Sequence, residues 1–554
     1  MMQASVLVYD YDTLLQQCHT VSPPHDSVPY DPRRYSVESE PSTHTSLHDD
    51  PCYTTTTTTT QQLFPRSSSS SPSRVAPCTP KDAAPCHDAR EPRWVRPLGY
   101  CEKLMTSAHR FGCMTTVYAL WLDARQTIDF DVIKHATTIM YRKMPHLRVV
   151  LGRHQGKLWW REMEVPLVDV KELVTDDVVT TLEALLRRRY CMEEGPLWFV
   201  RFVSLNLDGE CTRDRNHNEK YKYACIFGFH HNVSDGTTNM KFCKVFLQVL
   251  NDLLQGKDID ICEEGTFAEP LHDRIADMAT SQWSLFTLFL SRFYKGVLSY
   301  GAYISNFTRL FQMPAHNDAA TRVLQYELDD ITSKKLYLRC KMEGVTLNSA
   351  FTAAANLALY RMMSSKSDSL DITDINCVQA VNMRRYWPKQ LQPNTFGCHI
   401  STLDVGFRTE RRNLEEFWEY SRQVHSDLAH HLTTTQRALS VQPISERLKL
   451  VIGSNFWLDQ VGLPSTNDNH YCVTNMGNLN STFPGTGEEV EVSKVLRSVS
   501  CHFMPTLCQH TVQTFRGRFC YSLDYYTQKM KRETASQYAQ DIIDTLISSI
   551  HTPN

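Results

Sequence analysis

The stretch His230-His231-Asn232-Val233-Ser234-Asp235-Gly236 carries the residues whose types and spacing could do chemistry. Imidazole titrates near neutral pH, so a histidine here could accept a proton from a hydroxyl or an amine. Asp235 lies too close in sequence to His231 to reach the same ring easily, and it is better suited to anchor the turn through a cationic or backbone donor. We therefore expect His231 to act as a base, and we expect Asp235 and Gly236 to shape a tight turn.

Three other interpretations of this motif are open. An isolated His-His pair is most often a hydrogen-bonded part of a turn. A metal site would need a further ligand, and the sequence has no H-E-x-x-H or similar partner at recognisable spacing, so no metal is expected. A Ser-His-Asp hydrolase would use Ser234, but no G-x-S-x-G elbow surrounds this serine. The motif by itself leaves the structural turn as the main rival of the base.

The elements around the motif would place it between a strand and a helix. Residues 223–229 form an apolar run of strand length that leads directly into the two histidines. Residues 240–254 then show one apolar face at helical spacing, and Gly256 can cap the end. The motif is therefore expected in a strand-to-helix connection.

The rest of the chain alternates between strand and helix patterns, which predicts an α/β fold. Further strands are expected at residues 115–122, 146–151, 197–205, 375–381, 448–456, 471–474 and 519–523. Further helices are expected at residues 130–144, 182–190, 330–341, 345–363 and 535–550.

The chain of 554 residues is long enough for more than one domain. Residues 1–92 are rich in Ser, Thr and Pro and predict a disordered tail. An N-terminal subdomain at 93–312, a linker at 313–321 and a C-terminal subdomain at 322–554 should follow. Within residues 283–307, basic residues interrupt an aromatic run, so we expect a packed helix, with a peripheral membrane contact as the alternative.

The composition limits which binding partners and which cellular location we expect for the protein. A net charge of −3 gives no general attraction to nucleic acid, so no nucleic-acid partner is expected. The 18 cysteines include no C-x-x-C pair and are expected to be small buried thiols. The first residues lack the basic start and apolar core of a secretory signal. These features predict a cytoplasmic protein, or one held peripherally on a membrane.

The motif fits the H-H-x-x-x-D-G signature of the CoA-dependent acyltransferase superfamily, and other segments resemble that superfamily in the same order. They are residues 145–148 (hP-x-LR), 381–384 (vNlR), 396–397 (a glycine turn), 474–477 (sNxG) and 515–523 (the penultimate strand). The resemblance spans roughly residues 93–554. It is greatest to alcohol acyltransferases and to stand-alone relatives of condensation domains, and the D-F-G-W-G motif of the plant-type branch is missing.

This resemblance implies a fold of two similar chloramphenicol acetyltransferase-like subdomains. Each would be a mixed sheet with flanking helices, and together they would enclose a central tunnel. His231 would deprotonate the acceptor, while His230 and Gly236 would serve the structure of the motif. Asp235 would pair with Arg384, or alternatively with Arg385, and so hold the motif loop.

The resemblance also implies that Thr474 and Asn475 line the tunnel and are candidates for stabilising an oxyanion. The alternative interpretation is that both are turn residues at the end of a strand, with no part in catalysis. The implied activity is transfer of an acyl group from acyl-CoA, as co-substrate, to the hydroxyl or amine of a small lipid-like or secondary-metabolite acceptor. No bound cofactor and no covalent acyl-enzyme are needed, and a monomer is expected. A condensation module acting on carrier-bound substrates and a non-catalytic tunnel-binding protein are the rival functions.

Overall fold

The computed structural model describes residues 92–551 except 110–111, 113, 206–211, 214–218, 269–306, 308–309, 312–318, 368–369, 387–394, 440–468, 486–487 and 502–505. The expected tail at 1–92, the aromatic segment at 283–307 and the strand at 448–456 lie wholly or almost wholly outside the described residues. Most of the expected linker at 313–321 does so too.

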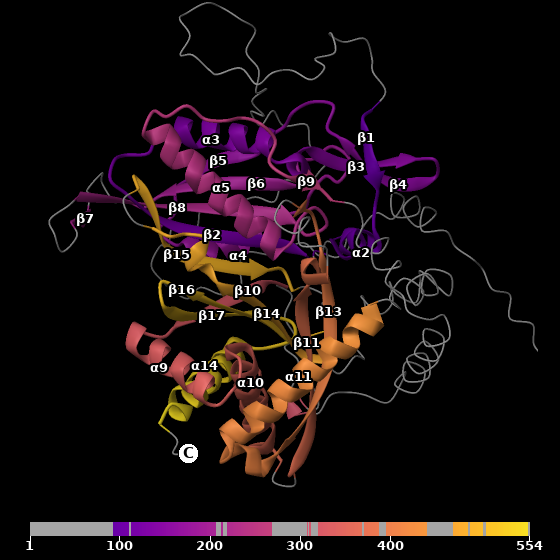
Figure 1. Ribbon diagram of the computed structural model, residues 1–554, viewed down its shortest axis with the longest axis vertical. Coiled ribbons are helices and arrows are strands. Elements are labelled where there is room, and N and C mark those ends of the chain that lie inside the picture. The colour runs from indigo at the N-terminus through magenta and orange to yellow at the C-terminus, as the bar shows by residue number, and fades with distance from the viewer. Residues whose placement is uncertain are drawn as a thin grey trace, which may run out of the picture.

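Two large sheets organise the described residues, one above the other in Figure 1. The first has the strand order β15-β2-β8-β6-β5, with the short β7 beside β8. Its strands are β2 (Thr115–Ala124), β5 (Val170–Leu173), β6 (Trp198–Ser204), β7 (Thr212–Arg213), β8 (Glu219–His230) and β15 (Val490–Val499). The second has the order β10-β17-β16-β14-β11-β13. Its strands are β10 (Thr321–Glu327), β11 (Ile372–Asn382), β13 (Ile400–Glu410), β14 (Asn469–Asn478), β16 (Cys508–Phe515) and β17 (Arg518–Tyr526).

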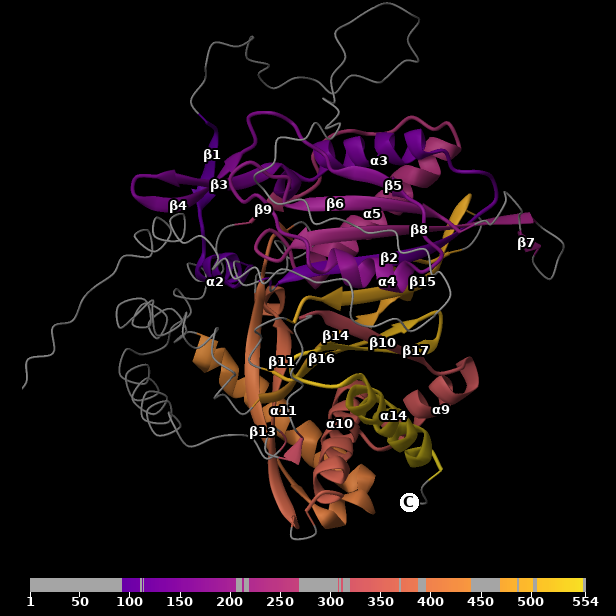
Figure 2. The same cartoon turned by 180° about the vertical axis from the view of Figure 1, so that it is seen from behind.

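Helices cover both faces of the first sheet. In Figure 1, α3 (Phe130–Lys143) and α5 (Gly236–Leu254) lie on the near face, and α4 (Val178–Leu185) covers the opposite face in Figure 2. Alternate residues of β8 enter separate cores, because side chains of a strand point to opposite faces in turn. Phe227 and Phe229 pack with α5, whereas Ile226 packs with α4.

The second sheet packs against a group of helices in the lower part of Figure 1. They are α9 (Asp330–Met342), α10 (Leu347–Ser364), α11 (Phe417–Leu439) and α14 (Arg532–Ser549). The alanine-rich α10 is buried along most of its length and lies against both α11 and α14. Small side chains allow this central helix to approach its neighbours closely.

Strand β15 joins the two halves of the chain. It comes from the C-terminal half but pairs antiparallel with β2, with Arg497 opposite Tyr118. A second link is the short parallel pair of β9 (Thr266–Phe267) and β12 (Thr395–Phe396). The fold class is confirmed: two α/β subdomains each carry a sheet with flanking helices. They share main-chain hydrogen bonds at these two places.

A smaller sheet of β1 (Trp94–Pro97), β4 (Lys157–Glu162) and β3 (Val149–His154) completes the N-terminal half. Helix α2 (Tyr100–His109) follows β1. The strand expected at 146–151 is wrong at its start, since Pro145–Arg148 form a 3-10 helix, η1, that β3 follows. Proline is favoured at the first position of such a turn.

Two other boundaries differ from the expectation. Helix α4 begins at Val178, earlier than predicted, because the Asp177 side chain accepts hydrogen bonds from the backbone N–H groups of Val179 and Thr180. The penultimate strand expected at 515–523 is two strands, since Arg516 and Gly517 adopt positive φ and form the turn of the β16–β17 hairpin.

Two further findings concern the helices and the cysteines. Within the described ranges, no helix is long and apolar enough to cross a membrane. Most of the cysteines there are buried thiols, as expected, but Cys262 takes part in a disulfide. The expectation of reduced thiols throughout is therefore wrong for Cys262.

Candidate active site

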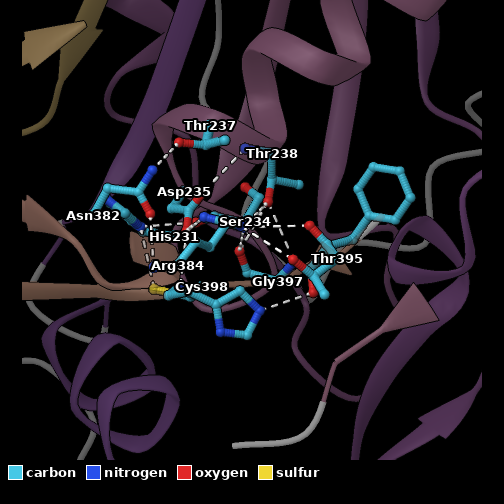
Figure 3. Close-up of polar contacts among 12 residues, drawn as sticks. His231, Ser234, Asp235, Thr237, Thr238, Asn382, Arg384, Thr395, Gly397 and Cys398 are labelled. Atoms are coloured by element: carbon cyan, nitrogen blue, oxygen red, sulfur yellow. Dashed lines mark hydrogen bonds and ion pairs between the residues drawn. The ribbon is translucent and has the colours of Figure 1, made fainter. Parts of the chain in front are cut away.

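The motif lies in the connection from β8 to α5, as its pattern predicts (Figure 3). His230 ends the strand and Gly236 is the first helical residue. The backbone N–H of His231 donates to the carbonyl of Met114 at 3.0 Å, just ahead of β2. Asp235 caps the helix, because its Oδ1 accepts from the N–H of Thr238 at 2.9 Å. The loop is thus held at one end by a main-chain hydrogen bond and at the other by the Asp235 side chain.

The imidazole of His231 has a defined orientation. Its Nδ1 lies 2.8 Å from the carbonyl oxygen of Ser234. A carbonyl only accepts, so Nδ1 carries the proton and Nε2 keeps its lone pair. No described side chain or backbone group hydrogen-bonds to Nε2. The arrangement presents Nε2 as the basic atom of the ring.

The surroundings keep this ring neutral. Burial lowers the pKa of His231 below its ordinary value, and the positive charge of Arg497 lowers it further. Asp235 opposes this effect, but its charge is shared with other donors. A neutral imidazole is the form that can accept a proton.

Asp235 is the centre of a buried group of hydrogen bonds (Figure 3). Its Oδ2 accepts from Nη1 of Arg384 at 2.7 Å and from the backbone N–H of His399 at 2.7 Å. The Arg384 guanidinium and these hydrogen bonds hold the pKa of Asp235 at about 2, although burial alone would raise it. The carboxylate is therefore ionised and paired at neutral pH, and it does not contact the His231 ring.

The structure brings Arg384, and not Arg385, to the motif. Arg384 lies in the 3-10 helix η3 (Met383–Tyr386) after β11, and its Nη2 also donates to Oγ1 of Thr238 at 2.8 Å. The adjacent Arg385 is exposed. Asn382 adds a second bridge, because its Nδ2 donates to Oγ1 of Thr237 at 3.0 Å. The start of α5 is thus tied to the end of β11.

The glycine turn expected at 396–397 completes this group. The carbonyl of Gly397 accepts from Oγ1 of Thr238 at 2.9 Å. Gly397 has a φ of +126°, and a Cβ atom there would lie 2.8 Å from Nε2 of His399. Only glycine suits this position without strain. The turn aims the N–H of His399 at Asp235.

Gly236 serves the site in a different way from the tight turn that the sequence suggested. Its φ is not in the left-handed region. A Cβ atom at Gly236 would lie 3.2 Å from Sδ of Met476, so the missing side chain allows β14 to approach the helix. Close packing explains this glycine.

His230 faces away from the His231 ring into a buried group of aromatic rings. Its Nδ1 accepts from the N–H of Asn232 at 3.1 Å, and its ring centroid lies 4.3 Å from that of His109. Burial lowers its pKa well below the ordinary value. These contacts favour a structural role for His230.

Thr474 and Asn475 have no contact with His231 among the described contacts. The Oγ1 of Thr474 accepts from Gln509 at 2.9 Å. Asn475 is exposed and its Nδ2 donates to Oδ1 of Asn348 at 3.4 Å. An oxyanion role for either residue stays a prediction that these contacts do not favour.

Two site residues are missing from the sequence-based set. His399 supplies a backbone donor, which no side-chain pattern can reveal. Cys398 is buried, and its Sγ lies 3.7 Å from Nδ1 of His231. Because Nδ1 already donates to Ser234, this thiol does not face the basic nitrogen of the ring. The position of Cys398 directly after the glycine turn is the only signal that could have indicated it.

Several solved structures of known proteins share the fold of this chain. The trichothecene 15-O-acetyltransferase of Fusarium sporotrichioides has a similar fold, with a TM-score of 0.61, 12% identity, and 82% of this chain and 94% of that chain covered. The first condensation domain of the calcium-dependent antibiotic synthetase gives a TM-score of 0.58, 12% identity, and coverage of 83% and 98%. The condensation domain of the monacolin K polyketide synthase gives a TM-score of 0.57 at 12% identity, with 83% of this chain and 99% of that chain covered. At these identities the likeness shows the fold.

No curated protein sequence matches the chain at a significant level. The sequence profile described as alcohol acetyltransferase matches residues 193–477, just over half of the chain, and this range includes the motif and Arg384. The superfamily that the sequence resembled is confirmed. The chain belongs to the alcohol acetyltransferase family and is an acyltransferase.

Proposed function

We propose that this acyltransferase moves an acyl group from acyl-CoA to the hydroxyl of a small lipid-like or secondary-metabolite acceptor, with Nε2 of His231 as the general base. One observation carries the proposal: Nδ1 of His231 donates to the carbonyl of Ser234 at 2.8 Å, which leaves Nε2 unprotonated. The lowered pKa of this buried ring supports the same role.

The reaction proceeds by direct attack. The acceptor oxygen bonds to the thioester carbon while its proton passes to Nε2 of His231, and the carbonyl π electrons move onto oxygen. When this tetrahedral intermediate collapses, the carbon–sulfur bond breaks and the CoA thiolate takes the proton from Nε2. The base is regenerated without a covalent acyl-enzyme. General-base assistance of this kind is typically worth about 10²- to 10⁴-fold in rate.

A hydroxyl acceptor is favoured over an amine by two similarities. The matching family is described as alcohol acetyltransferase, and the similar fungal enzyme is a 15-O-acetyltransferase. His231 could serve an amine acceptor equally well, so the acceptor panel in the test includes amines. Acyl-CoA acts as co-substrate, and the mechanism uses no bound cofactor.

The test measures release of free CoA with a thiol reagent. Purified protein is mixed with acetyl-CoA or longer acyl-CoA and with a panel of alcohols and amines. Wild type should release CoA in an acceptor-dependent manner, and His231→Ala should lower the rate by about 10²-fold or more. His425→Ala is the matched control, since the His425 ring hydrogen-bonds to Ser349 on α10, within the second subdomain. Its rate should equal that of wild type.

The rival functions predict other outcomes. Equal CoA release by wild type and His231→Ala would overturn the base assignment. Turnover only with an acyl group on a carrier protein would favour a condensation-type module, whose fold this chain shares. Stabilisation by acyl-CoA without turnover would favour a non-catalytic binding protein.

A further inference from the structure

Arg497 is a buried arginine without a carboxylate partner. Its side chain belongs to β15 and the residue is 4% exposed. The other buried arginines of the described ranges are ion-paired: Arg96 with Glu102, Arg201 with Asp169, and Arg384 with Asp235. The guanidinium of Arg497 donates from Nη1 to Oγ1 of Thr511 at 3.0 Å, and its Nε has no hydrogen-bond partner among the described residues. A buried cation in this state is unfavourable unless a ligand supplies negative charge.

The nearby carboxyl group of Asp524 compensates this charge only in part. Its two oxygens accept from Oγ of Ser498 at 2.8 Å and from the N–H of Val499 at 3.0 Å. Burial raises the pKa of Asp524 to about 7, so a large fraction of the group is protonated at neutral pH. Part of the positive charge of Arg497 is therefore left without a compensating carboxylate at neutral pH.

The sheet places Arg497 beside the motif. Arg497 lies opposite Tyr118 in the antiparallel pairing of β15 with β2. The hydroxyl of Tyr118 lies 3.8 Å from where a Cβ of Gly236 would be, at the first residue of α5. Oγ of Ser234 and Oδ1 of Asn239 are buried and have no hydrogen-bond partner within the described ranges. The Tyr118 hydroxyl also makes no hydrogen bond of normal geometry there. Burial raises the pKa of Tyr118, and the nearby side chains of Arg497 and Asn239 oppose this rise. Buried polar atoms without such hydrogen bonds are commonly satisfied by water or by a polar ligand.

Arg497 also lies beside a cavity. It lines a cavity of about 430 Å³ between β15 and the β16–β17 hairpin, together with Thr511, Gln513 and Ser522. The lining combines cationic residues, among them Lys494 and Arg518, with the carboxylates of Glu327 and Asp330.

We infer that Arg497 is a catalytic residue that donates hydrogen bonds to the thioester carbonyl oxygen of the acyl donor as this oxygen becomes an oxyanion. The inference rests on the proposed function, because the oxyanion forms only when the acceptor adds to the thioester. As the acceptor proton passes to Nε2 of His231, the carbonyl π electrons reach the oxygen that Arg497 holds. The charge returns to re-form the carbonyl when the carbon–sulfur bond breaks.

A second effect follows from the same position. The charge of Arg497 helps to keep the pKa of His231 low, while Asp235 opposes it. The other groups facing His231 are neutral or already engaged: His230 has a strongly lowered pKa, and the thiol of Cys398 lies at Nδ1. Removal of the guanidinium should therefore raise the pKa of His231.

The test compares Arg497→Gln and Arg497→Lys with Arg201→Gln, an equally buried arginine on β6 that is paired with Asp169. Loss of one oxyanion donor typically lowers kcat by about 10²- to 10³-fold, and Arg497→Gln should do so with little change in KM for acyl-CoA. Arg497→Lys should recover part of the rate. The acid limb of kcat/KM should move to higher pH in Arg497→Gln. The melting temperature should stay unchanged or rise, because an unpaired buried charge is removed.

Arg201→Gln should show the reverse pattern, a lower melting temperature with an unchanged kcat per folded molecule. The inference is overturned if Arg497→Gln keeps the wild-type kcat, changes only KM, or loses stability as Arg201→Gln does. Failure of the inference is separable from failure of the proposed function. An inactive His231→Ala beside a fully active Arg497→Gln contradicts the inference alone, whereas an active His231→Ala contradicts the proposed function.

Discussion

Nη1 of Arg384 lies 2.7 Å from Oδ2 of Asp235, although 149 positions separate the two residues along the chain. Asp235 begins α5 in the first subdomain, and Arg384 follows β11 of the second. The pair is almost fully buried. It therefore ties the loop that carries His231 to the other half of the molecule.

Replacement of Asp235 by Asn should destabilise the protein and abolish activity together. Removing one partner of a buried pair strands the other charge, which typically costs about 3–5 kcal/mol. The free energy of unfolding in urea and the rate of CoA release are the measurements. Arg385→Ala, one residue from Arg384 but exposed, is the matched control and should change neither. Unchanged urea stability of Asp235→Asn would contradict the role of this pair in linking the halves.

The pH dependence of activity should reflect the lowered pKa of His231. A lowered pKa means that the neutral base persists to lower pH than for a free histidine, so the acid limb of kcat/KM should lie below about pH 6.5. A pH series with a saturating acceptor and limiting acyl-CoA measures it. A limb at or above pH 6.5 would show that the surroundings of the ring do not favour its neutral form.

Asp524 should make stability fall as pH rises. Its folded-state pKa is raised to about 7, so the folded state binds the proton more tightly than the unfolded state does. The stabilising contribution is complete below about pH 4 and is lost as the pH rises towards 7. At 1.36 kcal/mol per pKa unit, the loss is at most about 4 kcal/mol.

Asp524→Asn removes this titration and keeps the shape of the side chain. Compared with wild type, the variant should gain stability progressively between pH 5 and pH 8, measured as the free energy of unfolding in urea at each pH. Parallel curves for the two proteins would mean that Asp524 does not titrate in this range.

Gly397→Ala should destabilise the site more than Gly477→Ala. Both glycines have positive φ, which an alanine adopts at a cost of roughly 1–2 kcal/mol. At Gly397 the added Cβ would also lie 2.8 Å from Nε2 of His399, whereas nothing lies within 4 Å of a Cβ at Gly477. Thermal unfolding and CoA release of the two variants should differ accordingly. Equal effects would show that the crowding at His399 relaxes freely.

Local patterns in the sequence predicted most of the elements that carry the motif. The apolar run at 223–229 and the helical face at 240–254 correspond to β8 and α5, because hydrophobic periodicity reports which face of an element is buried. The same reasoning located α3, α10 and α14. It failed at 146–148 and at 516–517, where a proline turn and a two-residue hairpin turn interrupt an apolar pattern.

Contacts between distant segments were beyond that reasoning. Local patterns predicted no strand at 490–499, and none of them shows that β15 pairs with β2 in the other subdomain. Cys398, the backbone of His399 and Arg497 reach the site through such pairings and turns. Contacts between residues that are 100 or more positions apart in the sequence depend on how the whole chain packs.

The sequence by itself determined the superfamily, the histidine proposed as base and the strand-to-helix setting of the motif. The tertiary structure decided which arginine meets Asp235, since adjacent residues of the η3 turn point in different directions and burial selects Arg384. It gave Thr474 and Asn475 hydrogen bonds to Gln509 and Asn348, and it brought Arg497 near enough to lower the pKa of His231. A motif specifies residue types at short spacing, whereas the groups that complete a site come from folding that brings distant strands together.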